Sequence, residues 1–227
     1  MGRLFKILKE AGVWQHTIII YISDNGIAFP GAKTNLYDPS MRLPCIVKLP
    51  HSKFINTVSD AMVTWADLAP TILDLCNAIP KKYSFQGRSF KEVFGQEKAN
   101  GWDTIYASHT FHEITMYYPM RVIQTRKYKL IWNIASGLDY PHASDLIASP
   151  TWQKAINQPG KPYGKRKISD YLKRPAFELY DLQNDPDEID NLAYIPEYSG
   201  VLNKLKGKIK TFQERTQDPW IIKWEHE

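Results

Sequence analysis

The sequence predicts an α/β fold in which an α/β layer is followed by a small antiparallel sheet with a C-terminal helix. Three observations predict it: an unbroken apolar run near the start, a series of strand-like runs in the second half, and an amphipathic segment near the end. The chain has 227 residues, 43% hydrophobic and 23% charged, so each part can have its own core. We predict domains at residues 1–100 and 101–227, divided at the stretch 95–101, which begins and ends with glycine.

The first part begins with a predicted helix and a predicted buried strand. Four apolar residues repeat at helical spacing from Leu4 to Ala11, and Gly12 follows as a C-terminal cap. Residues 17–22 are almost all apolar or β-branched without alternation, which is typical of a strand buried on both faces. Helix, glycine and strand make half of a βαβ unit. The strand that should precede the helix is absent, so we expect the chain to begin inside a fold.

The remainder of the first part contains a long loop and three short elements. Residues 27–43 form a polar loop of a length that is usually functional or disordered. Residues 44–49 predict a strand, and residues 58–65 predict another short strand. Residues 69–76 predict a helix, because Pro70 lies in the first turn, where the missing N–H is not needed.

The second part is predicted to be an antiparallel sheet with one face covered by a helix. Strand-like runs lie at residues 104–108, 120–125, 128–133 and 177–180. Arg126 and Lys127 suggest a tight hairpin between the middle two, although the Asn-Gly signature is missing. The predicted covering helix carries four apolar residues on one face: Leu202, Leu205, Ile209 and Phe212.

Two polar residues, Asp24 and Asn25, directly follow the predicted buried strand and precede Gly26. In open α/β sheets, ligands bind just outside the carboxyl ends of the strands. Carboxylate and amide oxygens are hard donors that suit Ca²⁺ or Mg²⁺. On these three residues alone, an ordinary turn is the better interpretation, and only the surrounding chain favours a metal site.

Two charged runs lie in the second part. Six basic residues between Lys161 and Arg174 are typical of a solvated face, and charge contacts to a polyanionic glycan are the alternative. Five acidic residues between Asp181 and Asp190 lack the EF-hand spacing, so we interpret them as turn and helix-cap residues.

Several segments resemble the C-terminal half of the sulfatases of the alkaline-phosphatase superfamily. In this order and spacing they cover most of the chain: residues 20–26 (Ile-Tyr-Ile-Ser-Asp-Asn-Gly), 67–74 (Asp-Leu-Ala-Pro-Thr-Ile-Leu-Asp) with 87–89, and 178–182 (Glu-Leu-Tyr-Asp-Leu) with 184–188 and 191–193. Within this family, a second group of segments resembles the sulfamidase (heparan N-sulfatase, N-sulfoglucosamine sulfohydrolase) branch: residues 26–30, 33–37, 112–116 (His-Glu-Ile-Thr-Met), 118–121 and 218–220. The resemblance implies the C-terminal part of an alkaline-phosphatase-like α/β sandwich.

The resemblance also implies roles for individual residues. Sulfatases use a Ca²⁺ held by Asp and Asn side chains, and the later pair of these ligands falls on Asp24 and Asn25. Lys33 falls where the family places a catalytic cation against the substrate sulfate. The sulfamidase pattern has arginine at this position. Lysine keeps the positive charge but cannot form the two parallel hydrogen bonds that a guanidinium makes to an anion. The alternative interpretation is a solvated loop lysine. His112 and Glu113 are implied to lie near the substrate's sugar, although a lone histidine is more often structural or exposed.

The nucleophile motif of the family, Cys or Ser followed by x-Pro-x-Arg, does not occur in this sequence; neither Cys45 nor Cys76 fits it. The formylglycine that the family makes from this motif is therefore expected in a missing N-terminal half, and the calcium site is incomplete here. We expect the isolated chain to lack sulfatase activity. We also expect self-association or a complementing N-terminal half, because half of a parallel sheet leaves strand edges and apolar surface exposed.

The resemblance implies a hydrolase that removes sulfate esters or N-sulfate groups from amino sugars of glycosaminoglycans. Two alternatives stay open: a phosphate-transfer relative in the same superfamily, and a noncatalytic module that binds acidic glycans. The net charge of +5 and the absence of any long apolar run give no reason to expect nucleic acid or a membrane as partners. The resemblance implies a periplasmic, secreted or lysosomal location.

Overall fold

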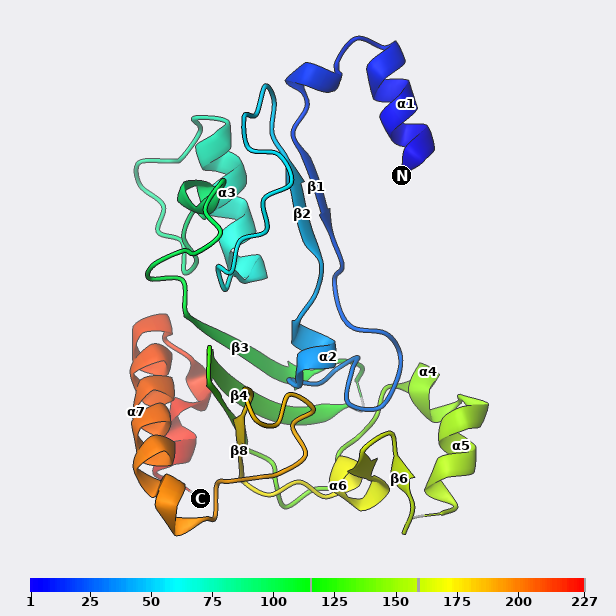
Figure 1. The fold of residues 1–227 in the computed structure, drawn as a ribbon. Helices are drawn as coiled ribbons and strands as arrows, with labels where there is room; N and C mark the ends of the chain where they lie inside the picture. Colours follow the sequence, from blue (N-terminus) through cyan, green and yellow to red (C-terminus); the bar gives the residue numbers. More distant parts are fainter. Residues whose placement is uncertain (115, 159, 227) are drawn as a thin grey trace.

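The computed structural model of the chain describes residues 1–114, 116–158 and 160–226. Figure 1 shows an upper part with α1, β1, β2 and α3, and a lower part in which a sheet lies between α7 and a group of short helices. The strands form a two-stranded sheet (β1-β2), a four-stranded sheet (β3-β4-β5-β8) and a small β6-β7 pair, and every pairing is antiparallel. The predicted mixture of helices and sheets, with an antiparallel sheet and a C-terminal helix, is confirmed.

The upper part contains most of the predicted elements. Its regular elements are α1 (Gly2–Glu10), β1 (Ile19–Ile22), β2 (Cys45–Lys48) and α3 (Leu68–Leu75), while α2 (Asp38–Met41), between β1 and β2 in the chain, lies beside the sheet of the lower part (Figure 1). Pro70 lies in the first turn of α3, as expected. The predicted strand at 58–65 is wrong. Two isolated backbone bonds, from the Asp60 and Met62 amides to residues 97 and 102, do not make a ladder.

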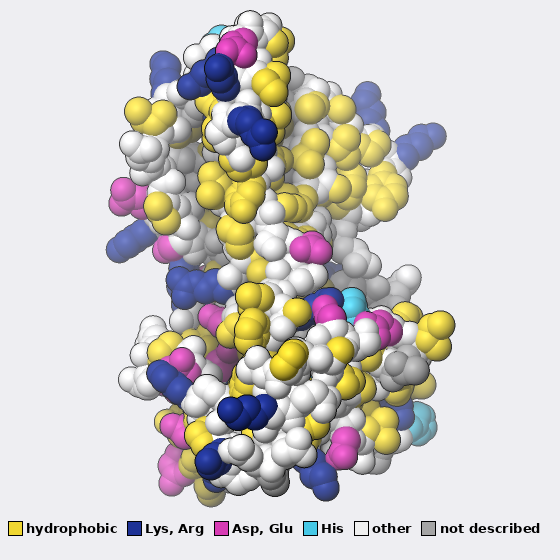
Figure 2. Space-filling view, turned by 90° about the vertical axis from the view of Figure 1, so that its right-hand side faces the viewer, with side chains coloured by type: hydrophobic (Ala, Val, Ile, Leu, Met, Phe, Trp, Pro, Cys, Tyr) yellow, Lys and Arg dark blue, Asp and Glu magenta, His cyan; other side chains and the backbone are white. Residues whose placement is uncertain are grey.

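The interpretation of residues 17–22 as a strand buried on both faces is also wrong for this chain. β1 pairs with β2 alone among the described residues, and Tyr21 and Ile22 are 44% and 36% exposed. Apolar side chains of α1 and β2, such as Ile7 and Ile46, are exposed as well. Figure 2 shows apolar side chains gathered over this upper part of the surface. The apolar run fits a buried strand, but no other described element covers it.

The lower part is built on the four-stranded sheet of β3 (Thr104–Phe111), β4 (Tyr117–Thr125), β5 (Tyr128–Asn133) and β8 (Phe177–Asp181). The Arg126–Lys127 connection forms the predicted tight hairpin, in which the Thr125 hydroxyl bonds both the amide and the carbonyl of Tyr128. Helix α7 (Ser199–Thr216) packs on one face, where Leu205 and Ile209 meet apolar residues of β4, β5 and β8.

The second face of this sheet is covered too, which corrects the expectation of a half-covered sheet. Leu36 and Tyr37 from the first half of the chain pack with Tyr140 against apolar residues of β4, β5 and β8. The remaining short elements lie beside this face: α4 (Ser144–Ile147), α5 (Pro150–Ile156), β6 (Pro162–Tyr163), β7 (Arg166–Lys167) and α6 (Ile168–Leu172). Short 3-10 helices occupy Trp14–His16, Trp65–Asp67, Lys91–Val93, Pro196–Tyr198 and Pro219–Trp224. Within the described residues, no helix has the length and apolarity needed to cross a membrane.

A buried polar network centred on Glu178 joins this second face to the loop that precedes α2. The Glu178 carboxylate accepts hydrogen bonds from Tyr37 (2.6 Å), Tyr180 (2.5 Å) and the Asn133 amide (2.6 Å). The guanidinium of Arg166 lies 3.7 Å from the same carboxylate. Four polar partners thus surround one buried anion. Their hydrogen bonds and charge offset the free-energy cost of removing the carboxylate from water.

The basic run is only partly the solvated face that its sequence predicts. Arg166 and Arg174 are 6% and 3% exposed. Arg166 lies over the Tyr37 ring and Arg174 stacks on Tyr140, at 4.1 and 3.6 Å from the ring centroids. Aromatic faces and the Glu178 network compensate for the loss of water around these two charges.

The acidic run forms the turn contacts that its sequence predicts. Among the described residues, its one contact with a helix start is across the fold, where Glu188 accepts the amide of Asp38 in α2 at 2.6 Å. Asp185 accepts hydrogen bonds from the amides of Ile189 and Asp190. Glu188 is buried and pairs at 2.7 Å with Lys129, whose side chain has no solvent exposure. The described residues contain no group of three or more His, Cys, Asp or Glu side chains that could hold a metal ion.

Replacing the network's central carboxylate should destabilise the protein strongly. Glu178→Ala leaves two tyrosine hydroxyls, an amide and a guanidinium without their acceptor, and breaking a buried pair in this way costs about 3–5 kcal/mol. Urea denaturation measures the loss. The exposed control Glu197→Ala should change stability by less than about 0.5 kcal/mol. Equal effects of the two variants would contradict the role of the network.

His142 predicts a loss of stability at acid pH. Burial, assisted by the nearby Arg174, lowers the pKa of His142 to about 3 from its usual 6.5. As the pH falls from 6.5 towards 3, the unfolded chain protonates this histidine while the folded chain keeps it neutral. The free energy of unfolding therefore decreases in this window, by up to about 1.4 kcal/mol per pH unit from this group. His142→Phe should show a shallower decrease between pH 6 and 4 in urea denaturation; parallel curves would refute the assignment.

Candidate functional site

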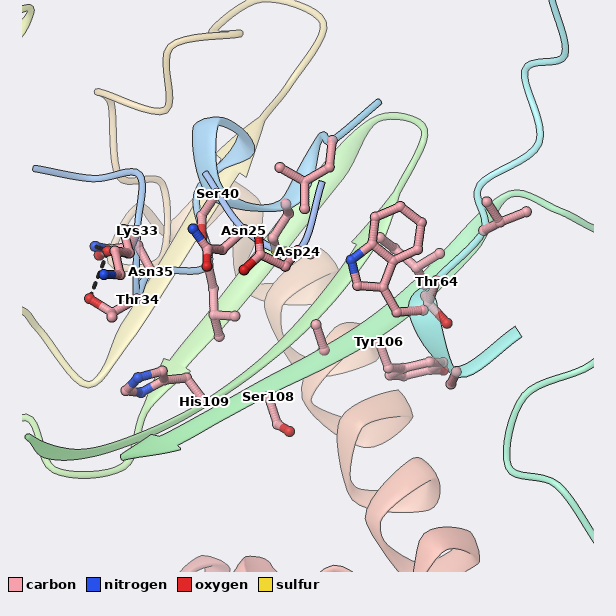
Figure 3. Close-up of a pocket in the computed structure, with 18 of the residues that line it drawn as sticks. Asp24, Asn25, Lys33, Thr34, Asn35, Ser40, Thr64, Tyr106, Ser108 and His109 are labelled. Atoms are coloured by element: carbon pink, nitrogen blue, oxygen red, sulfur yellow. Dashed lines mark hydrogen bonds between the residues drawn. The ribbon is translucent and has the colours of Figure 1, made fainter. Parts of the chain in front are cut away.

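A cavity of about 580 Å³ lies where the upper part meets the four-stranded sheet. Asp24, Asn25, Lys33 and His112 all line it, so the structure brings four of the five predicted site residues together. In Figure 3, Asp24, Asn25 and Ser40 lie near one another, with the segment 33–35 beside them. Tyr106, Ser108 and His109 extend from β3 in the same view. The lining also includes apolar side chains: Leu36, Met41, Leu43, Val63, Trp65 and Ile105.

The turn after β1 presents Asp24 and Asn25 to this cavity because Gly26 lies directly against another segment. A Cβ atom at Gly26 would collide with the backbone of Pro39 and Ser40. The Asn25 amide group donates to the Gly26 carbonyl at 2.7 Å, which turns the Asn25 side chain and leaves its oxygen able to accept. Glycine is required here for close backbone approach and not for an unusual dihedral angle.

The donor set of the turn fits part of a calcium site. Among the described residues, no hydrogen bond or ion pair occupies the Asp24 carboxylate, which is exposed at the cavity. Two hard oxygens suit Ca²⁺ or Mg²⁺, yet Ca²⁺ takes 6–8 oxygen ligands. Asp24 and Asn25 therefore provide a fraction of such a shell.

The loop that carries Lys33 is held by two segments that connect elements beside the sheet. The Tyr140 hydroxyl donates to the Thr34 carbonyl, and Arg174 donates to the Asn35 side chain at 2.5 Å. Thr34 has a φ of 64°, a left-handed conformation that β-branched residues rarely adopt. Such strain persists only where surrounding contacts enforce it, and it gathers at functional sites.

The ammonium group of Lys33 forms an ion pair with Asp145 at the start of α4. The Lys33 Nζ lies 2.6 Å from Asp145 Oδ2, and the two side chains are 21% and 45% exposed. The hydrogen bond from Lys33 is the main reason that the pKa of the Asp145 carboxyl is lowered. An ammonium group has three donors, so Lys33 can still donate to a ligand in the cavity.

His112 and Glu113 lie at the turn between β3 and β4, and only His112 lines the cavity. The His112 Nε2 lies 3.9 Å from Glu113 Oε1, and Glu113 accepts a hydrogen bond of 2.8 Å from Ser144. Glu113 is thus turned towards α4. Thr115, which belongs to the same predicted segment, lies outside the described residues.

Sequence reasoning missed other residues of the site. His109 lines the cavity, and its Nδ1 donates to the Tyr118 carbonyl at 3.1 Å because a carbonyl can only accept. Burial lowers the pKa of His109, so this ring is neutral near pH 7. Trp65, Tyr106 and Asp145 were also missed. The residues of β3 were missed because the sequence of a strand does not show which of its side chains border a cavity. Asp145 was missed because nothing in the sequence distinguishes it from the other acidic residues.

The arrangement combines oxygen donors, a cation and an aromatic side chain in one cavity. Lys33 and His112 can bind an anionic or polar group, Asp24 and Asn25 can help to hold a divalent cation, and Trp65 can contact the face of a sugar. The ring of Tyr106, which also belongs to the lining, is stacked on Phe212 of α7. Of the described hydroxyls and thiols that line this cavity, Thr64 donates to a carboxylate, that of Asp67 at 3.1 Å, and this contact is part of a helix capping box.

The chain has the alkaline-phosphatase-like fold of the sulfatases. The solved structure of BT4656 in complex with its substrate D-glucosamine-2-N,6-O-disulfate matches the fold with a TM-score of 0.68 at 24% identity, covering 96% of this chain and 38% of that one. An ulvan-active sulfatase of Formosa agariphila is 26% identical over 212 residues, which cover 92% of this chain and 35% of that protein.

The family within this class is that of N-sulphoglucosamine sulphohydrolase, to which the chain belongs. A family model described as N-sulphoglucosamine sulphohydrolase, C-terminal, matches residues 32–163. The human N-sulphoglucosamine sulphohydrolase is 37% identical over 231 residues, covering 97% of this chain and 46% of the human protein. The chain thus spans less than half the length of these curated relatives.

Adding one methyl group at Gly26 should disturb the Asp24–Asn25 turn. In Gly26→Ala the new Cβ collides with main-chain atoms of Pro39, which cannot move aside as a flexible side chain could, so we expect a loss of about 1–3 kcal/mol in unfolding free energy. Chemical denaturation checks this value. The matched control is Gly207→Ala in α7, where no atom lies within 4 Å and alanine should be neutral or stabilising. A Gly26→Ala protein as stable as Gly207→Ala would contradict the close approach.

Proposed function

We propose that this chain is the C-terminal portion of a sulfohydrolase that removes sulfate from sulfated amino sugars. The observation that carries the proposal is that Asp24, Asn25 and Lys33 line one cavity together with His112, which is distant from them in sequence, in a member of the N-sulphoglucosamine sulphohydrolase family. In this proposal, Asp24 and Asn25 are calcium ligands and Lys33 contacts the sulfate.

Each residue of the chain has a physical task in this proposal. Asp24 and Asn25 would hold Ca²⁺, which when bound neutralises the negative charge of the sulfate and of the attacking group. Lys33 would orient the sulfate by donating hydrogen bonds from a loop fixed by Tyr140 and Arg174. The formylglycine nucleophile would come from residues outside this chain, because the sequence has no Cys/Ser-x-Pro-x-Arg motif.

The proposed substrate is a sulfated amino sugar, either an N-sulfate or an O-sulfate. Two relatives support this class: a sulphohydrolase of N-sulphoglucosamine, and a structure with a glucosamine disulfate as substrate. The Trp65 side chain gives the cavity an aromatic surface suited to a sugar ring. We further propose that the protein acts in the periplasm, a lysosome or the extracellular space, where such glycans are degraded.

Two alternatives make different predictions. A phosphate-transfer enzyme of the same superfamily would act on phosphate or phosphonate esters, and the fold alone does not separate the two reactions. A noncatalytic glycan-binding module would bind heparin through exposed basic residues such as Lys161 and Lys173, whatever happens to Asp24. The burial of Arg166 and Arg174 removes two charges from that surface and weakens the second alternative.

A chimera tests the proposal. The isolated chain should not hydrolyse N-sulfoglucosamine, whereas a human N-sulphoglucosamine sulphohydrolase whose matching C-terminal portion is replaced by this chain should do so. Asp24→Ala in the chimera should lower kcat/KM at least about 100-fold, since even groups that only support a metal ligand contribute 10–100-fold. Release of sulfate is measured by ion chromatography.

The control variant is Asp170→Ala, an exposed carboxylate on α6 that should leave turnover unchanged. Turnover by the isolated chain would refute the proposed division of the site. A folded chimera that hydrolyses a phosphonate monoester instead would favour the phosphate-transfer alternative. Heparin affinity that survives Asp24→Ala, without any turnover by the folded chimera, would favour the binding module.

A further inference from the structure

The start of α4 contacts both loops that carry the predicted substrate-binding residues. Asp145 pairs with Lys33 at 2.6 Å, and the neighbouring Ser144 donates to Glu113 at 2.8 Å. These contacts join three segments that are widely separated in sequence, around residues 33, 113 and 145. Neither the sequence motifs nor the family resemblance assigns a role to α4.

The Asp145 carboxylate is well placed to be the counter-ion of Lys33. Its Oδ1 accepts the Leu146 amide at 2.8 Å, which fixes the carboxylate, while its Oδ2 faces the ammonium group. No other acidic side chain among the described residues lies within ion-pair distance of Lys33. A ligand anion that approaches Lys33 therefore meets a cation whose charge is already balanced.

The expected effect follows from the charges involved. Inorganic sulfate is a dianion, and the partly exposed Asp145 carboxylate next to Lys33 repels it through a region that is partly screened by water. We expect the carboxylate to weaken sulfate binding about five- to tenfold, which corresponds to about 1–1.4 kcal/mol.

We propose that Asp145 is an internal counter-anion that weakens the binding of free anions at Lys33, so that the site favours a sulfated sugar over inorganic sulfate. The inference rests on the proposed function and adds a specificity-determining residue to it. The sugar supplies further contacts, with His112 and the Trp65 side chain, that offset the repulsion. Inorganic sulfate has none of these contacts and is released readily after the reaction.

The test compares sulfate affinities of the full 227-residue chain. Sulfate is titrated at constant ionic strength and followed by NMR signals of the 33–35 segment. Asp145→Asn should tighten sulfate binding about five- to tenfold, because the amide keeps the size and one acceptor of the carboxylate but not its charge. Lys33→Ala should abolish the binding. Thermal melting confirms that each variant is folded.

The matched control is Asp187→Asn, which removes the carboxylate of another exposed Lys–Asp pair, 2.5 Å from Lys165. It should leave sulfate affinity within twofold of the parent. If Asp145→Asn leaves the affinity unchanged or weakens it, while Lys33→Ala still abolishes binding, the counter-anion role is wrong and the proposed function stands. If Lys33→Ala does not reduce sulfate binding, the sulfate contact in the proposed function fails as well.

Discussion

The buried carboxylate of Glu178 is the constraint on which the site depends. It lies on β8, on the face of the sheet that is opposite α7, and its partners there are Tyr37, Tyr180, Asn133 and Arg166. Tyr37 belongs to the same stretch of chain as Lys33, so the anion fixes the loop against the sheet. A buried charge without these partners would be strongly unfavourable, and the loop therefore has little freedom to leave.

Arg174 and Tyr140 fix the part of the same loop that borders the cavity. Arg174 stacks on Tyr140, and these two side chains hold the main chain at Thr34 and the side chain of Asn35. The strained backbone at Thr34 is the local consequence. Lys33 is thus placed by a rigid support, which is what a residue that must orient a ligand requires.

Much of the architecture could be predicted from local sequence patterns, because the spacing of apolar residues distinguishes helices from strands. The helix with Leu205 and Ile209, the hairpin at Arg126–Lys127 and Pro70 at a helix start are examples. The second covering layer could not be predicted. It is built from short, irregular segments in which apolar side chains pack beside buried polar groups. The burial of Arg166 depends on its contact with Glu178, and the run of basic residues around Arg166 does not reveal that contact.

The site was predictable to the extent that it followed a motif. The structure places Asp24, Asn25, Lys33 and His112 at one cavity, whereas Glu113 points to Ser144 and lies outside the lining. Asp145 escaped prediction because its importance comes only from its distance to Lys33. The apolar run at β1 was read correctly as a strand, but its burial requires a covering layer that the described residues do not provide.

The central claim is that the turn after β1 supplies part of a cation shell. A titration of the chain with Ca²⁺, followed by the backbone amide signals in NMR spectra, tests this most directly. We predict weak binding, with a dissociation constant on the order of 1 mM or above because the shell is incomplete, and signal shifts centred on Asp24 and Asn25. Shifts centred instead on the acidic run between Asp181 and Asp190, or the same shifts in an Asp24→Ala variant, would contradict the claim.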